Sequence, residues 1–216
     1  MKINQRKLES ALTLTEVLVI VAVLAILVVL LLPALYSPVG YAPRTQCVNN
    51  LKQIGLGFRM WAKDHNSKFP MGIPINERGT QEWITTGEAF RHFQALSNEL
   101  LTTRLLACPA DIRQPAENYA VIRSTNISYF VGLDASEVYP ATFLCGDRNL
   151  TNGTPLTNGI LELTSKNVVG WTAEMHNEQG NILLSDGSVQ SLSSAKLREA
   201  LQATGIGTNR LAMPLD

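Results

Sequence analysis

The chain has 216 residues, a length that suits one modest globular domain with an appendage. Its 18 Lys and Arg residues balance 18 Asp and Glu residues, so no basic excess indicates a nucleic-acid partner and no acidic block indicates a disordered tail. Hydrophobic residues make up 45% of the chain, and a large share of them stands before position 36.

The first element is a polar start followed by a long apolar run. Residues 1–11 carry three basic side chains, whereas residues 12–35 carry one charged side chain, Glu16. As a helix this run would reach about 36 Å at 1.5 Å per residue, and a bilayer core needs about 20 apolar residues. The sequence therefore predicts a transmembrane helix with its N-terminus in the cytoplasm and the bulk of the chain outside.

Two ordinary interpretations of this segment compete. A secretory signal peptide has an apolar core of about 7–15 residues and a small-x-small cleavage site. The run here is longer, and its best such site, Gly40-Tyr41-Ala42, is followed by Pro43. An uncleaved signal anchor explains the length and the flanking charge, but it leaves the carboxylate of Glu16 without a reason.

The residues ALTLTE at positions 11–16 resemble the processing site of type IV prepilins and type II secretion pseudopilins. In that family a small residue, normally Gly, precedes the cut, and a Glu stands fifth in the mature chain. The resemblance implies cleavage by a prepilin peptidase between Ala11 and Leu12, followed by N-methylation of Leu12. Pro33 matches a proline that these helices carry 21 residues after the first mature residue. Ala11 in place of Gly is a departure that is expected to slow processing.

The resemblance also suggests a role for Glu16. An ionised carboxylate in hydrocarbon is unfavourable unless it is paired. In an assembling bundle of such helices, its expected partner is the α-amine of Leu12 on a neighbouring subunit. Ala11, Leu12, Glu16 and Pro33 are therefore the expected cleavage and assembly element.

A kinked continuation of the helix is expected over residues 36–65. Prolines and a glycine interrupt the helical pattern across Tyr36–Ala42. Apolar residues then recur at steps of three and four from Cys47 to Trp61, and the helix should end near Asp64. Its apolar face should be covered by a head formed by residues 66–216.

The head shows helices and strands in alternation. A helix is expected over 88–101, with His92 off its apolar stripe and exposed. β-branched and aromatic content predicts strands over 126–133, 142–145 and 168–172, and a hairpin with strands over 182–185 and 188–192. A last helix should cover 195–204, with a cap at Ser194 and an end at Gly205. The expected fold is α+β and pilin-like, with a long N-terminal transmembrane helix packed on a small antiparallel sheet.

The most specific motif of the head is His176, nine residues, and then Asp186-Gly187. It resembles an H-x9-DG motif that accompanies prepilin-type N-termini in a group of bacterial pseudopilin-like proteins. The segments Cys108-Pro-Ala-Asp111 and Gly146-Asp147-Arg148-Asn149 resemble further signatures of that group. We favour a structural interpretation, in which Asp186-Gly187 forms a two-residue turn with positive φ at both positions. His176 would then hydrogen-bond the hairpin or Asp147.

The alternative for this motif is a cation site. Asp111, Asp147 and Asp186 would supply oxygen ligands, which suit calcium, with His176 as an additional ligand. Major pseudopilins bind calcium in a C-terminal loop, but their ligands do not match this chain residue by residue. No other cofactor is expected.

The three cysteines are an odd number, and they lack the spacing of a zinc site. If the head leaves the cytoplasm, Cys108 and Cys145 are a candidate disulfide that leaves Cys47 free.

The sequence does not indicate an enzyme. His176 and Asp186 lack an accompanying nucleophile elbow or reactive cysteine, and no phosphate-binding glycine loop is present. The expected function is that of a structural subunit of a type II secretion pseudopilus or a type IV pilus-like filament. Its expected partners are prepilin peptidase, other subunits, an inner-membrane assembly platform and membrane lipids, and its expected location is the bacterial inner membrane with an extracytoplasmic head. The alternative is a membrane-tethered module that binds a glycan, a metal or an exported protein without polymerising.

Overall fold

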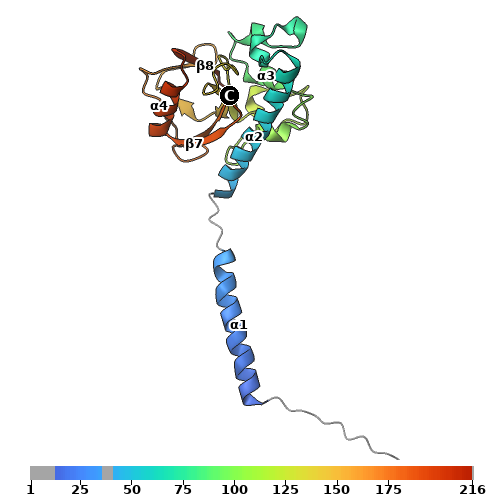
Figure 1. Ribbon diagram of the computed structural model, residues 1–216, viewed down its shortest axis with the longest axis vertical. Helices are drawn as coiled ribbons and strands as arrows, with labels where there is room; N and C mark the ends of the chain where they lie inside the picture. The colour runs from blue at the N-terminus through green and yellow to red at the C-terminus, as the bar shows by residue number, and fades with distance from the viewer. Residues whose placement is uncertain (1–12, 36–40, 216) are drawn as a thin grey trace, which may run out of the picture. The chain divides into compact units, whose positions relative to one another are not determined.

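The computed structural model describes residues 13–35 and 41–215, and within these it describes 31–35 and 41–42 by their backbone alone. The chain divides into two compact units, Met1–Val39 and Gly40–Asp216, which are drawn in Figure 1.

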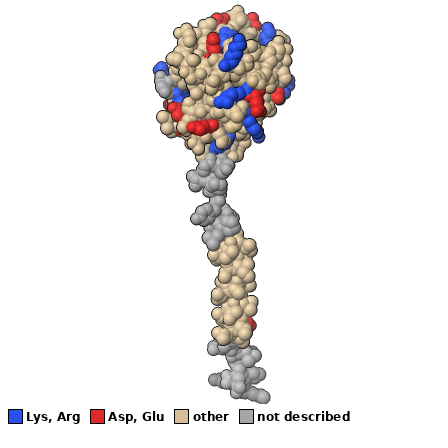
Figure 2. Space-filling view, turned by 90° about the vertical axis from the view of Figure 1, so that its left-hand side faces the viewer, with Lys and Arg blue, Asp and Glu red and all other residues tan. Residues whose placement is uncertain are grey.

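The first unit contains helix α1, Leu14–Leu35, whose backbone stays helical through Pro33. Thr13 caps its start, because the Glu16 amide donates to the Thr13 hydroxyl while the Thr13 amide and hydroxyl donate to Oε2 of Glu16. This reciprocal arrangement is a capping box. The described large apolar side chains of α1 are between 44% and 84% exposed, and most of the helix surface in Figure 2 is free of charge.

The expected transmembrane helix is a wrong prediction. Among the described residues, no helix is both long enough and apolar enough to cross a membrane. Over the residues that the structure describes, the fold is therefore α+β without the membrane span that the sequence pattern suggested.

The second unit begins with helix α2, Tyr41–Asp64. Its apolar stripe is fully buried and consists of Cys47, Leu51, Ile54, Phe58 and Trp61. The helix ends at Asp64, as the periodicity predicts. Tyr41 and Ala42 are helical, although an interruption was expected there, because Pro43 falls in the first turn, where its missing N–H removes no helical hydrogen bond.

Within residues 41–215, six strands form one antiparallel sheet in the order β4-β8-β1-β2-β6-β7. In chain order they are β1 Tyr129–Gly132, β2 Phe143–Asp147, β4 Ile160–Thr164, β6 Gln179–Leu184, β7 Val189–Ser193 and β8 Thr208–Ala212. A separate pair consists of β3 Leu150–Thr151 and β5 Gly170–Trp171. The remaining helices are α3 Ala89–Ala95, α4 Ser194–Ala203 and short 3₁₀ turns at η1 Pro70–Gly72, η2 Ile75–Glu77, η3 Gln81–Trp83, η4 Thr103–Leu106 and η5 Ser124–Asn126.

The sheet is covered on both faces. Along β1, Tyr129 and Val131 belong to a core cluster that includes the stripe of α2, whereas Phe130 belongs to a second cluster that includes Leu197 of α4. Successive strand side chains point to opposite faces, so α2 and α4 cover different faces, in agreement with Figure 1. A sheet covered on both sides explains why its central strands β1 and β2 are buried along their whole length.

The helix over 88–101 is shorter than predicted, and His92 is buried rather than exposed. Helix α3 ends at Ala95, so the stripe assumed for a longer helix does not define its faces. His92 is fully buried, and its Nδ1 lies 2.7 Å from the hydroxyl oxygen of Thr80.

The hairpin of β6 and β7 stands where the sequence predicts it, but its turn is different. Gly187 has a φ of 87°, whereas Asp186 does not have a positive φ. The Gly187 amide donates to the Leu184 carbonyl, and the Leu184 amide donates to the Ser188 carbonyl. The connection between Leu184 and Ser188 is therefore a three-residue loop, 185–187, that ends in a left-handed glycine, not a two-residue turn.

The C-terminal helix is displaced by one residue from the prediction. Ser193, not Ser194, caps α4 and accepts a hydrogen bond from the Lys196 amide. Gly205 follows the helix with a φ of 73°, the left-handed conformation expected at its end.

Candidate functional site

Residues from all three head motifs meet at the end of strand β2, with the exception of Asp186-Gly187. The segment Gly146-Asp147-Arg148-Asn149 runs from β2 into the following loop. A Cβ atom on Gly146 would lie 2.7 Å from ring carbons of Phe130 and 2.8 Å from the carbonyl oxygen of Asn181, so only glycine allows the strands to approach here. Asp147 and Asn149 are buried, and each contacts the segment that carries His176.

A disulfide joins Cys47 on α2 to Cys108 in the loop after η4, with a Cα–Cα distance of 5.3 Å. The expected pair of Cys108 with Cys145 is therefore wrong. Cys145 is the free cysteine, because it sits inside β2 with its side chain buried in the core. Both disulfide residues are buried as well, Cys47 fully and Cys108 with 1% exposure.

His176 lies directly against this disulfide. Its Nε2 is 3.4 Å from Sγ of Cys108 and 3.4 Å from Oδ2 of Asp147. The side chain of His176 is 3% exposed. The contact with Asp147 is one of the two partners that the sequence suggested for His176, whereas the hairpin is not at this end of β6.

The loop that carries His176 is held in an unusual backbone conformation. Met175, Asn177 and Glu178 all have positive φ, which costs roughly 1 kcal/mol or more for each residue that is not glycine. The buried amide of Asn149 compensates by donating to the carbonyls of Thr172, Glu174 and Gln179 on both sides of the loop. Such strain is typical of functional sites, and here it fixes the position of the imidazole.

Arg148 ties the loop to the segment of Cys108. Its guanidinium donates to both carboxylate oxygens of Asp111 at 2.8 and 2.9 Å and to Glu174 at 2.9 Å. Asp111 also accepts from the Ile112 amide. Both carboxylate oxygens of Asp111 are therefore paired with the Arg148 guanidinium, which makes Asp111 a poor ligand for a metal cation.

Asp147 is the most perturbed group of the site. Burial raises its pKa to about 7, although Oδ2 accepts hydrogen bonds from the backbone amide and the side-chain amide of Asn181. Oδ1 is buried and has no hydrogen-bond partner among the described residues. Burial and the nearby Arg44 guanidinium lower the pKa of His176. Both shifts favour a neutral imidazole beside a carboxyl group that exchanges its proton near neutral pH.

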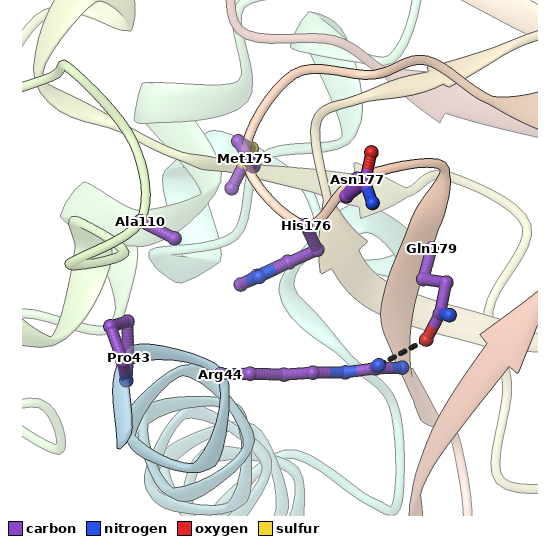
Figure 3. Close-up of a pocket in the computed structure, with 7 residues that line it drawn as sticks. All are labelled: Pro43, Arg44, Ala110, Met175, His176, Asn177 and Gln179. Atoms are coloured by element: carbon purple, nitrogen blue, oxygen red, sulfur yellow. Dashed lines mark hydrogen bonds between the residues drawn. The ribbon is translucent and has the colours of Figure 1, made fainter. Parts of the chain in front are cut away.

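A pocket of about 440 Å³ opens beside His176. Figure 3 shows the Arg44 side chain crossing it from α2 toward Gln179, to whose side-chain oxygen it donates a hydrogen bond. Met175, Asn177, Ala110 and Pro43 complete the lining. Neither cysteine of the disulfide is among the residues that line this pocket.

Asp186 does not belong to this site. His176 precedes strand β6 and Asp186 follows it, so the strand places them roughly 20 Å apart at about 3.3 Å per residue. One carboxylate oxygen of Asp186 accepts from the Ser188 amide, which stabilises the hairpin loop with Gly187. The proposed calcium set of Asp111, Asp147 and Asp186 is therefore wrong for this chain.

The N-terminal site residues are only partly described. Ala11 and Leu12 lie outside the described residues, and Pro33 is described by its backbone alone. Glu16 caps α1 with Thr13, a role that the sequence reasoning missed. The spacing Thr-x-x-Glu at 13–16 is the known signal for such a cap and would have predicted it.

The chain matches no protein-family model, no curated protein and no solved structure.

Proposed function

We propose that this chain is a structural subunit of a pilin-like filament, either a type II secretion pseudopilus or a type IV pilus-like fibre. It is cleaved after Ala11 by a prepilin peptidase and joins its neighbours through α1. The observation that carries this proposal is the surface of α1, whose described apolar side chains are exposed from Leu14 to Leu30.

A helix that is apolar on all sides requires cover from other apolar groups. At about 25 cal/mol per Å² of buried apolar surface, packing such helices together is a strong driving force for assembly. In the head, by contrast, acidic and basic side chains are intermixed on the face that Figure 2 shows. This contrast supports an assembly in which α1 is the shared interface and the head faces solvent.

Glu16 lies in the first turn of this interface. The capping box accounts for its orientation, since Oε2 accepts from both the amide and the hydroxyl of Thr13. The negative charge that remains would pair with the methylated α-amine of Leu12 on a neighbouring subunit and set the axial register. Assembly platform proteins would supply each new subunit.

The disulfide supports a head that matures outside the cytoplasm. Disulfides persist in oxidising compartments and are rare where thioredoxin and glutathione keep thiols reduced. The Cys47–Cys108 bond joins the buried face of α2 to the loop after η4, so it secures the junction between the helix and its head.

The test is filament assembly by Glu16 variants in cells that carry a prepilin peptidase and the assembly platform. Glu16→Gln keeps the side-chain acceptor that a capping box needs, but it removes the charge. Thr13→Ala is the matched control, because it removes the capping hydroxyl and keeps the carboxylate. A cysteine introduced at Val21, which is 60% exposed, reports contact between copies by disulfide cross-linking.

We expect Glu16→Gln to abolish cross-linked multimers and Thr13→Ala to retain them. Normal multimers with Glu16→Gln would show that capping is the whole role of Glu16. Absence of multimers in the otherwise unchanged chain would contradict the filament and favour a head that binds a ligand without polymerising.

A further inference from the structure

The residues around the disulfide include a set of potential metal ligands, two of which are the sulfur atoms that the disulfide joins. Sγ of Cys47, Sγ of Cys108 and a ring nitrogen of His176 all lie within 4.8 Å of one another. The carboxylate of Asp147 adds an oxygen 3.4 Å from Nε2 of His176. The other carboxylate oxygen, Oδ1, is buried and has no hydrogen-bond partner among the described residues, so the Asp147 carboxylate has an unused acceptor.

The distances fit a tetrahedral zinc ion. Bond lengths of about 2.3 Å to sulfur, 2.0 Å to nitrogen and 2.0 Å to oxygen place a sulfur and a nitrogen ligand about 3.5 Å apart, and a nitrogen and an oxygen ligand about 3.3 Å apart. Nε2 of His176 is 3.4 Å from Sγ of Cys108 and 3.4 Å from Oδ2 of Asp147. Two edges of the tetrahedron are therefore already formed.

We propose that reduction of the Cys47–Cys108 disulfide converts this cluster into a Zn²⁺ site with Cys47, Cys108, His176 and Asp147 as its four ligands. The two sulfur atoms must separate to about 3.8 Å, and rotation about the Cα–Cβ bonds supplies this movement. The site is thus either a disulfide or a metal centre, depending on the redox state of the chain.

The chemistry balances in two steps. A dithiol reductant cleaves the S–S bond, supplies two electrons and two protons, and leaves as its own disulfide. Zn²⁺ then binds the two thiolates and the carboxylate, and the protons of both thiols and of any protonated Asp147 pass to solvent. Zinc binding therefore strengthens as pH rises.

Neighbouring side chains hold two of the proposed zinc ligands, Asp147 and His176, in place. Asn181 donates two hydrogen bonds to Oδ2 of Asp147 and orients the carboxylate, as outer-shell partners do at metal sites. The amide of Asn149 fixes the strained loop that presents His176. A neutral imidazole is the form that binds a metal, and burial favours that form here.

This inference goes beyond the filament and does not depend on it. A chain that fails to polymerise could still bind zinc, and a filament subunit could lack the metal site. In a reducing compartment the zinc form would be stable, and in an oxidising compartment the disulfide would replace it.

The experiment is a Co²⁺ titration of the full chain in detergent. A phosphine reduces the disulfide without competing for the metal: it takes up an oxygen atom from water as its oxide, and the water protons become the two thiol protons. Thiolate-to-cobalt absorption reports binding, and displacement by Zn²⁺ gives the zinc affinity. We expect one Co²⁺ per reduced chain and none per oxidised chain.

The variants identify the ligands. His176→Ala should weaken zinc binding by more than about 100-fold, since loss of an outer-shell partner alone weakens it by 10–100-fold. Cys145→Ala is the matched control, because it removes the cysteine outside the cluster and should leave binding unchanged. Circular dichroism of each oxidised variant establishes that the head has folded.

Thermal unfolding of the unmodified chain is a second test, which needs no variant. Zn²⁺ should raise the unfolding temperature of the reduced chain and leave that of the oxidised chain unchanged, because a ligand that binds only the native state stabilises it. The proposal is overturned if the reduced chain takes up no Co²⁺ and gains no stability from Zn²⁺. It is equally overturned if His176→Ala binds as tightly as the unmodified chain, or if binding requires Cys145.

Discussion

The Cys47–Cys108 disulfide closes a loop of 61 residues between α2 and the segment after η4. The perturbation that tests its contribution is the double variant Cys47→Ala/Cys108→Ala. In the chain-entropy model, a cross-link over a loop of this length removes about 14 cal/mol/K from the unfolded state, which corresponds to about 4 kcal/mol at 25 °C. We expect the double variant to lose this amount of unfolding free energy.

The assay is urea unfolding followed by circular dichroism, together with thermal unfolding under the same buffer and detergent. For a chain of this size, about 4 kcal/mol lowers the unfolding temperature by roughly 10 °C. Cys145→Ala is the control, since it removes one buried sulfur without opening a loop. If the double variant loses no more than about twice the free energy lost by Cys145→Ala, loop closure does not stabilise the head and the reasoning is refuted.

Two further predictions concern buried polar groups of the head. Burial lowers the pKa of His92 to about 4, so the stability it contributes is complete above pH 6.5 and is lost as pH falls through 4. Between pH 7 and pH 4 the unmodified chain should lose about 3 kcal/mol more unfolding free energy than His92→Gln, which does not titrate. Asn149→Ala should cost about 1–3 kcal/mol, because it removes the hydrogen bonds of a buried amide to three part-buried carbonyls of the His176 loop. Asn152→Ala, at a half-buried asparagine whose amide donates to a single carbonyl, should cost less than 1 kcal/mol.

Each of these predictions has a contrary result. Parallel stability curves of the unmodified chain and His92→Gln would mean that His92 is not buried as a neutral group. Equal losses for Asn149→Ala and Asn152→Ala would mean that the amide of Asn149 does not hold the loop.

Helix α2 and the β6–β7 hairpin were predictable because their signals are local. The stripe from Cys47 to Trp61 repeats every three or four residues, and one face of a helix must be apolar if it covers a sheet. The hairpin is marked by Asp186-Gly187 between two apolar runs. Its turn type was not predictable, since it depends on the backbone hydrogen bonds of Leu184 with Gly187 and Ser188 rather than on the Asp-Gly pair.

Strands β4 and β8 were missed because their pairing is distant in the chain. Ile160–Thr164 pairs with Thr208–Ala212, and β8 includes Asn209 and Arg210, which do not read as a strand by composition. Asn209 is buried and donates to the Thr204 hydroxyl, so its amide is satisfied inside the fold. Contacts of this kind override local propensity.

The site was predictable in its members but not in its connections. His176, Asp147, Asp111 and Cys108 were all singled out from the sequence, yet Cys47 was taken as the free cysteine. Spacing alone does not determine which cysteines pair, because the alternatives differ only in three-dimensional distance. The role of the Asn149 amide, which joins two segments across the loop, likewise required the geometry.

The central claim is that the N-terminal segment is a processed assembly element. The most direct test is the intact mass of the chain recovered from cells that contain prepilin peptidase. The account predicts a chain that begins at Leu12 and is heavier by one methyl group. A chain that still begins at Met1, or one that begins at Pro43, would contradict it.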